Sequence, residues 1–99
     1  MNYTSLAGTI SNRRPEGSDG IKFSLAVPRE NHVNDFDHLL CISFGETAKE
    51  IALLPMSARI RLEGKIQRSA RRNKQTGARR DTTEILVLRI EDANTPAVA

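Results

Sequence analysis

Apolar and polar residues alternate along several short stretches of this 99-residue chain, and the alternation indicates β-strands. From Ile21 to Val27 every odd-numbered residue is apolar, whereas Lys22 and Ser24 are polar. From Ile60 to Ile66 every even-numbered residue is apolar or glycine, and the residues between them are charged. A period of two with one polar face is typical of an antiparallel strand that packs one face on a core.

Three further stretches are predicted to be strands: residues 4–10, 38–44 and 83–90. The first alternates like the two stretches above, and the second is mixed. The third is apolar on both faces between Ile85 and Leu88, which predicts a more deeply buried strand.

Turn-forming residues separate these stretches. Arg14–Gly20 is predicted to link the first two strands, and residues 28–37 are predicted to form a polar loop before the third. Residues 67–82 are predicted to include the end of a long hairpin, with a turn at 73–77.

One segment, Glu46–Leu54, is predicted to be a helix. Ala48, Ile51 and Ala52 are spaced as on one apolar face of a helix, and Pro55 follows where the helix should end. The predicted order is therefore three strands, one helix and two strands.

That order predicts an all-β fold, the OB-fold, a five-stranded Greek-key barrel with one short helix between strands three and four. Other small barrels are the alternative, because element order alone does not fix the topology. Gly8 and Gly64 lie inside predicted strands, where glycine permits a sharp bend or a bulge. We expect one domain over residues 1–92 and a disordered C-terminal tail over residues 93–99, which has little apolar content.

Charge is concentrated in one part of the chain. Residues 59–80 contain nine Lys and Arg and a single acid, Glu63, so this segment carries +8 and leaves −5 of the total +3 for the rest. A basic surface on a mildly acidic body favours a polyanionic partner. A solvated basic loop without a partner is the alternative interpretation.

Six short segments, taken in order and spacing, resemble a known family. They are Asn2–Gly8, Gly20–Val27, Ser43–Gly45 followed by Ala48, Ile60–Ile66, Gln75–Gly77 and Thr82–Val87. Over roughly residues 2–91 the chain resembles the bacterial single-stranded DNA-binding proteins. The resemblance implies an OB-fold that binds single-stranded DNA in replication, recombination or repair and assembles as a homo-oligomer, a dimer or tetramer. The ending Asn94–Ala99 lacks the family's acidic tip and looks more like its short primosomal replication-restart relatives.

Base stacking in this family depends on aromatic side chains, and the resemblance suggests where they would be. Phe44 falls at one such position, while His38 and Arg72 stand at two others. Phe44 in the barrel core is the alternative, since phenylalanine is usually buried. Tyr3 and Phe36 are candidates to line the same groove or to pack locally. With few aromatic residues, we expect weaker and more salt-dependent binding than in the family at large.

Phosphate contacts are predicted to come from the basic segment. The candidates are Arg59, Arg61, Lys65, Arg68, Arg71, Arg72, Lys74, Arg79 and Arg80. Arginine can also stack its planar guanidinium on a base, which would partly replace a missing aromatic ring.

Other functions find little support in the sequence. His32, His38 and the only cysteine, Cys41, do not form a metal-binding pattern, and Cys41 is predicted to be a core residue. No phosphate-binding loop or nucleophile elbow is present, so we expect no catalytic residues, no metal and no cofactor.

No apolar run reaches the ~20 residues of a membrane span. The N-terminal residues do not form a secretory signal, and we expect a cytoplasmic, nucleoid-associated protein without a membrane partner.

Two alternatives to single-stranded DNA binding stay open at this point. The chain could be an adaptor subunit of a replication-restart assembly that works mainly through contacts with replication proteins. It could also bind single-stranded RNA, in which case the 2′-hydroxyl would set the preference.

Overall fold

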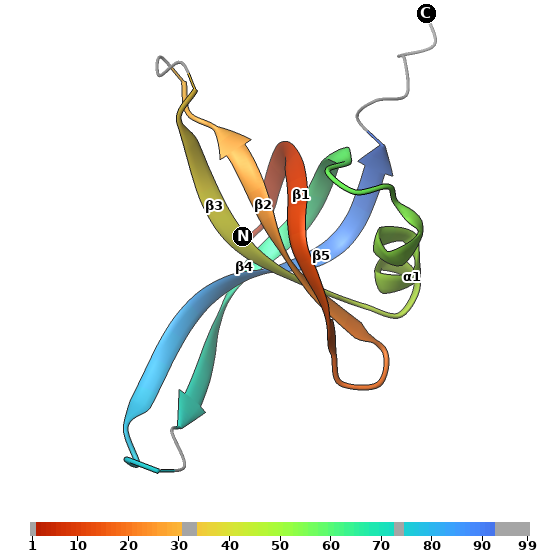
Figure 1. Ribbon diagram of the computed structural model, residues 1–99. Coiled ribbons are helices and arrows are strands. Elements are labelled where there is room, and N and C mark those ends of the chain that lie inside the picture. Colours follow the sequence, from red (N-terminus) through yellow and green to blue (C-terminus); the bar gives the residue numbers. More distant parts are fainter. Residues whose placement is uncertain (1, 31–33, 73–74, 93–99) are drawn as a thin grey trace, which may run out of the picture.

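Five strands of this chain close into a barrel in the order β1-β2-β3-β5-β4 (Figure 1). The computed structural model describes residues 2–30, 34–72 and 75–92, with the backbone alone at 69, 71, 72, 80 and 92. The elements are β1 (Thr4–Glu16), β2 (Gly20–Pro28), β3 (Phe36–Phe44), α1 (Gly45–Leu53), β4 (Arg59–Arg72) and β5 (Arg79–Asp92). Strands β3 and β5 are parallel and the other neighbours are antiparallel. A closed five-stranded barrel with its helix between the third and fourth strands confirms the predicted OB-fold.

Three element boundaries differ from the sequence-based prediction. Arg14–Glu16, expected in a turn, lies in β1 and pairs with β2, so the connecting turn is shorter. Phe36, expected in a polar loop, begins β3 opposite Pro28. The arms of the long hairpin stay paired from Gln67 opposite Glu84 to Arg72 opposite Arg79. In each case pairing with a neighbouring strand extends the strand beyond the bounds that the local sequence pattern indicated.

The core is built from the inward-facing residues of all five strands and α1. Its buried members are Ile10, Phe23, Leu25, Cys41, Ile51, Ile60, Leu62, Ile85 and Val87. Phe23 and Cys41 are therefore core residues, as predicted. On α1 Ala48 and Ile51 are buried, whereas Ala52 is exposed.

The prediction that the last strand is deeply buried on both faces is wrong at Leu88. In the pairing of β4 with β5, Glu63 faces Arg89 and Gly64 faces Val87, so Leu88 is an extra, unpaired residue. Leu88 follows the inward-facing Val87 and by alternation lies on the outer face, where it is 44% exposed. The bulge acts on the residues that follow, so that Ile90 and not Arg89 packs against the core. Gly64 permits the close approach at this point, because a Cβ there would lie 2.5 Å from the Leu86 carbonyl oxygen.

Strand β5 is described to Asp92, and the domain boundary predicted at this residue stays a prediction. The predicted tail, residues 93–99, and Lys74 lie outside the described residues. No helix in the described part of the chain has the length and apolar character needed to cross a membrane.

Candidate nucleic-acid interface

Strand β3 presents a row of side chains on the outside of the barrel. Its register with β2 pairs Phe36 with Pro28, His38 with Ala26 and Phe44 with Gly20. These are even-numbered positions, whereas the odd-numbered neighbours Phe23, Leu25 and Cys41 point into the core. Because side chains alternate between the faces of a strand, Phe36, His38 and Phe44 share the outer face. Three residues predicted from the sequence are therefore brought onto one surface.

Phe44 lies on this surface and not in the core. Its side chain is 44% exposed, and the ring covers Gly20, where a Cβ would lie 2.8 Å from the ring Cε1 atom. The helix α1 begins at the next residue, and the Thr47 hydroxyl donates a 2.9 Å hydrogen bond to the Phe44 carbonyl oxygen. One ring face is thus supported by β2 while part of the ring stays open to a planar ligand.

Phe36 stands at the other end of β3, where an ion-pair cluster holds the β2–β3 connection. Arg29 contacts Asp37 at 2.8 Å and Asp35 at 3.4 Å, and its backbone N–H donates to the Asp35 carbonyl oxygen at 3.0 Å. Phe36 is 44% exposed and His38 is exposed. This end of the face therefore offers two exposed rings beside one basic and two acidic groups, which together carry a net charge of −1.

Lys65 and Tyr3 flank the same surface across β5. Lys65 pairs with Leu86, whose other neighbour is Ile42 of β3, so the three residues form one row on the outside of the barrel. The Lys65 ammonium lies 5.8 Å from the centroid of the exposed Tyr3 ring. A cation over an aromatic face is held by the ring quadrupole, and this contact places a charge and a ring together at the base of the hairpin.

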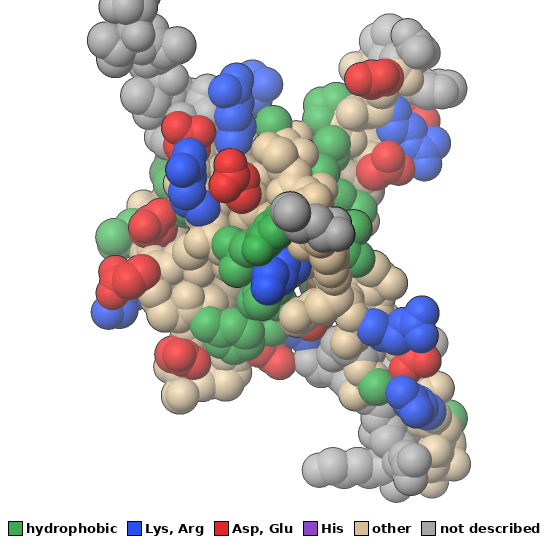
Figure 2. Space-filling view, turned by 180° about the vertical axis from the view of Figure 1, so that it is seen from behind, with side chains coloured by type: hydrophobic (Ala, Val, Ile, Leu, Met, Phe, Trp, Pro, Cys, Tyr) green, Lys and Arg blue, Asp and Glu red, His purple; other side chains and the backbone are tan. Residues whose placement is uncertain are grey.

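The β4–β5 hairpin projects away from the barrel (Figure 1). Its arms carry Arg68 and Arg79, both exposed, and Arg79 contacts Asp81 at 3.1 Å. The backbones of Arg71 and Arg80 pair directly, as do those of Arg72 and Arg79, so four of the predicted basic residues lie in two adjacent rows. Figure 2 shows basic side chains, with an acidic side chain between them, on the described part of this hairpin.

Arg59 and Arg61 lie elsewhere. They are exposed near the start of β4, where they pair with Thr9 and Ala7 of β1. Strand β4 is separated from β3 by β5 on one side and by β1 and β2 on the other. Arg61 also faces Glu91 across the β4–β5 pair. The structure therefore does not bring these two arginines together with the rings of β3.

The surface around Arg61 has mixed charge. A shallow cavity there is lined by Arg61 and Arg89 together with Glu63 and Glu91, and Glu63 faces Arg89 directly. Figure 2 shows basic and acidic side chains interspersed over the part of the barrel next to the end of β5. Opposite charges facing each other across strands offset one another, so this region attracts polyanions less than the hairpin does.

Metal binding has little basis within the described residues. No group of three or more His, Cys, Asp or Glu side chains in residues 2–30, 34–72 and 75–92 could hold a metal ion. Burial raises the pKa of the Cys41 thiol to about 12, so it is protonated and unreactive in the folded protein.

Two basic residues that the sequence pattern did not single out lie next to this face. Arg14 and Lys22 face each other across β1 and β2, and Lys22 is paired with Ile42 of β3. The alternation in the sequence already indicated that Lys22 and the core residue Phe23 lie on opposite faces of β2, which was a usable signal for an outward-facing Lys22. Arg14 could not be assigned from the pattern, because the irregular pairing of β1 decides its direction.

The comparisons with known proteins rest on structure alone. No protein-family model matches the sequence, and no curated protein matches it. Among solved structures, the chain is similar to the mitochondrial single-stranded DNA-binding protein of S. cerevisiae, with a TM-score of 0.68 and 16% sequence identity. The match covers 92% of this chain and 93% of the yeast chain. At this identity the likeness concerns the fold, and the chain shares its barrel architecture with a single-stranded DNA-binding protein.

Proposed function

We propose that this chain binds single-stranded DNA without strong sequence preference and acts in replication, recombination or repair. The observation that carries the proposal is the outer face of β3, where Phe36, His38 and Phe44 present exposed rings in one row. Stacking on such rings tolerates every base, since each base has a π-face. The likeness to the yeast protein adds support at the level of the fold.

The row of rings is long enough for several nucleotides. Phe36 and Phe44 are eight positions apart in one strand, which is roughly 26 Å at about 3.3 Å per residue. Leu40 lies between them on the same face and is half-buried, so it supplies apolar surface in the middle. A single strand could follow β3 and continue to Lys65 and the basic hairpin, within the site size of about 4–16 nucleotides for one OB-fold.

Charge on the hairpin supports the same function. The proposed phosphate contacts are Lys65, Arg68, Arg71, Arg72, Lys74, Arg79 and Arg80. Arg59 and Arg61, which lie beside β1, are left out of this set. Each neutralised phosphate releases counterions, so affinity should fall steeply with salt. Membership of the single-stranded DNA-binding protein family, a dimeric or tetrameric state, and a cytoplasmic, nucleoid-associated location belong to the same proposal.

The test is fluorescence anisotropy with labelled oligo-dT of about 35 nucleotides, long enough for more than one OB-fold site. Oligo-U and duplex DNA of matched length are measured beside it over a salt series. We expect tight, salt-sensitive binding to oligo-dT and weak binding to duplex. Equal affinity for duplex, or no binding at low salt, would refute the proposal. A preference for oligo-U would instead establish RNA binding.

Binding of a replication protein is a second candidate, which exposed apolar residues favour. Leu53 and Met56 are 86% and 88% exposed at the end of α1 and in the loop that follows it. Exposed apolar patches of this kind are typical of protein contacts. If the adaptor function is the main one, Leu53→Ser with Met56→Ser should abolish capture of replication proteins while oligo-dT binding is unchanged. Capture that persists would contradict it.

A further inference from the structure

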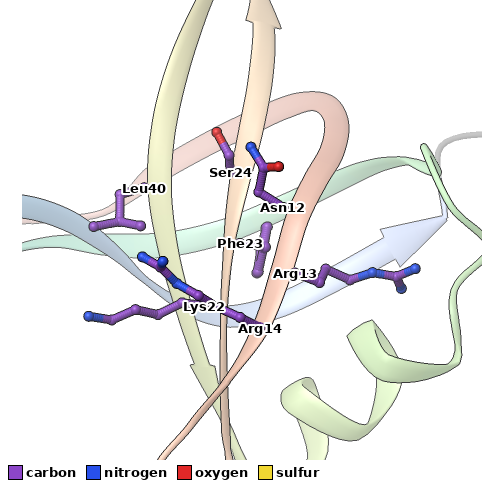
Figure 3. Close-up of a pocket in the computed structure, with 7 residues that line it drawn as sticks. All are labelled: Asn12, Arg13, Arg14, Lys22, Phe23, Ser24 and Leu40. Atoms are coloured by element: carbon purple, nitrogen blue, oxygen red, sulfur yellow. The ribbon is translucent and has the colours of Figure 1, made fainter.

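A cavity of about 460 Å³ opens beside the outer face of β2, next to an irregular stretch of β1 (Figure 3). The residues that matter for its chemistry are Asn12, Arg14, Lys22, Ser24 and Leu40. Its volume falls within the range of about 300–1,000 Å³ for small-molecule sites. Arg13 and Phe23 complete the lining, so cationic and polar groups surround the apolar side chains of Phe23 and Leu40.

The bulge in β1 creates this cavity. Ser11 pairs with Ser24 and Arg14 pairs with Lys22, so two residues of β1 stand opposite the single residue Phe23. Asn12 takes the left-handed backbone conformation, with φ of 53°, which bends the strand there. Without these extra residues β1 would run flat beside β2.

Arg13, the second extra residue, points away from the cavity toward α1 (Figure 3). Its Nη1 donates hydrogen bonds of 2.7 and 2.8 Å to the carbonyl oxygens of Ile51 and Leu54. These two bonds anchor the bulge to the end of the helix. The shape of the cavity is therefore set by the contact between the β1 bulge and α1.

Arg14 and Lys22 are the unusual pair in this cavity. They face each other directly across β1 and β2, and like charges in that arrangement repel. Their side chains point to the same side, toward Leu40 (Figure 3). Lys22 is only 5% exposed, and the described residues give its ammonium one ion pair, with Glu16 at 3.6 Å. One carboxylate beyond hydrogen-bonding distance balances only part of two positive charges, so an anion between them would be stabilised.

We infer that this cavity is a subsite for one nucleotide of a bound single strand, with a phosphate between Arg14 and Lys22. The sugar and base contact Leu40, while Asn12 and Ser24 offer hydrogen bonds to polar atoms of the nucleotide. Leu40 pairs with Ser24 and lies between His38 and Ile42 on the outer face of β3. The subsite is therefore continuous with the row of rings. It directs part of the strand across β2 toward β1, away from the hairpin.

This inference rests on the proposed function and is tested with the same oligo-dT assay. The variants are Arg14→Gln, at an exposed residue, and Lys22→Gln, with thermal unfolding to verify folding. The matched controls are Arg89→Gln, in the mixed-charge region, and Lys49→Gln, on α1. Each cavity variant should weaken binding about three- to tenfold and reduce the salt slope by about 0.7. The controls should match the wild type.

The outcomes separate the subsite from the function. If Arg14→Gln and Lys22→Gln bind like wild type while Phe44→Leu binds weakly, the subsite is refuted and single-strand binding stands. If Lys22→Gln does not fold, Arg14→Gln alone is the test: wild-type binding refutes the subsite and weakened binding supports it. If the wild-type protein binds no oligonucleotide, the proposed function fails and the subsite fails with it.

Discussion

Replacement of Phe44 by leucine removes a flat ring from the β3 face while retaining an apolar side chain. Stacking is worth about 1–3 kcal/mol per base. Because about 1.4 kcal/mol corresponds to a factor of ten, Phe44→Leu should weaken oligo-dT binding about 5- to 150-fold. The ring is 44% exposed and rests on Gly20, so nearly half of its surface never left water on folding. We therefore expect a stability loss of about 1 kcal/mol or less.

The same substitution at Phe23 is the matched control. Phe23 is 1% exposed and belongs to the core, so Phe23→Leu should lower the free energy of unfolding by more than Phe44→Leu does. Its oligo-dT affinity per folded molecule should stay near that of the wild type. For a domain of this size, about 1 kcal/mol shifts the Tm by about 4–8 °C, which separates the two variants in a thermal scan.

Anisotropy titration and thermal unfolding of both variants test these expected affinities and stabilities. We expect the Phe44 substitution to lower mainly the oligo-dT affinity and the Phe23 substitution to lower mainly the free energy of unfolding. Equal affinity of Phe44→Leu and the wild type, with both fully folded, would show that no base stacks on this ring. A loss of stability at Phe44 as large as that at Phe23 would show that the exposed ring acts as a core residue.

Four further predictions concern the scaffold. Arg13→Met removes two hydrogen bonds to the end of α1 and should lower the free energy of unfolding in urea by about 1.5–3 kcal/mol; an unchanged value would mean that the bulge is not anchored there. Cys41, whose pKa is raised by burial from 9.0 to about 12, should react with a thiol reagent only after denaturant is added, and rapid labelling of the native protein would contradict this. Between these two pKa values only the unfolded chain ionises the Cys41 thiol. The thiol's contribution to stability is therefore present below pH 9 and declines toward pH 12. Cys41→Ala should reduce that decline. Gly64→Val, whose Cβ would lie 2.5 Å from the Leu86 carbonyl oxygen, should disrupt the β4–β5 pairing, and a wild-type Tm would refute the role of this glycine.

The local sequence pattern predicted which strands and helix form better than it predicted the residues at which they begin and end. The alternation at Ile21–Val27 and Ile60–Ile66 marks two strands whose inward residues are the core, and the spacing of Ala48 and Ile51 marks α1. The ends are set by partners far away in the sequence. Phe36 joins β3 because Pro28 lies opposite it, and no local preference of residues 28–37 would indicate that.

The candidate site shows the same division. Sequence predicted that the rings of Phe36, His38 and Phe44 could meet a ligand, but only the register of β3 places them on one face. Arg59 and Arg61 looked continuous with the hairpin, and barrel closure instead places them beside β1. Proximity along the chain is a poor measure of proximity around a barrel.

The sequence alone determined which elements form, which residues face inward and where positive charge gathers, because strand alternation and hairpin charge depend only on neighbours along the chain. Only the tertiary structure decided which outward residues share a surface. That depends on strand order and register, and on the bulges that turn Ile90 inward and bring Arg14 opposite Lys22. A single inserted residue reverses the direction of the side chains that follow, so these choices are made by pairing across the whole barrel.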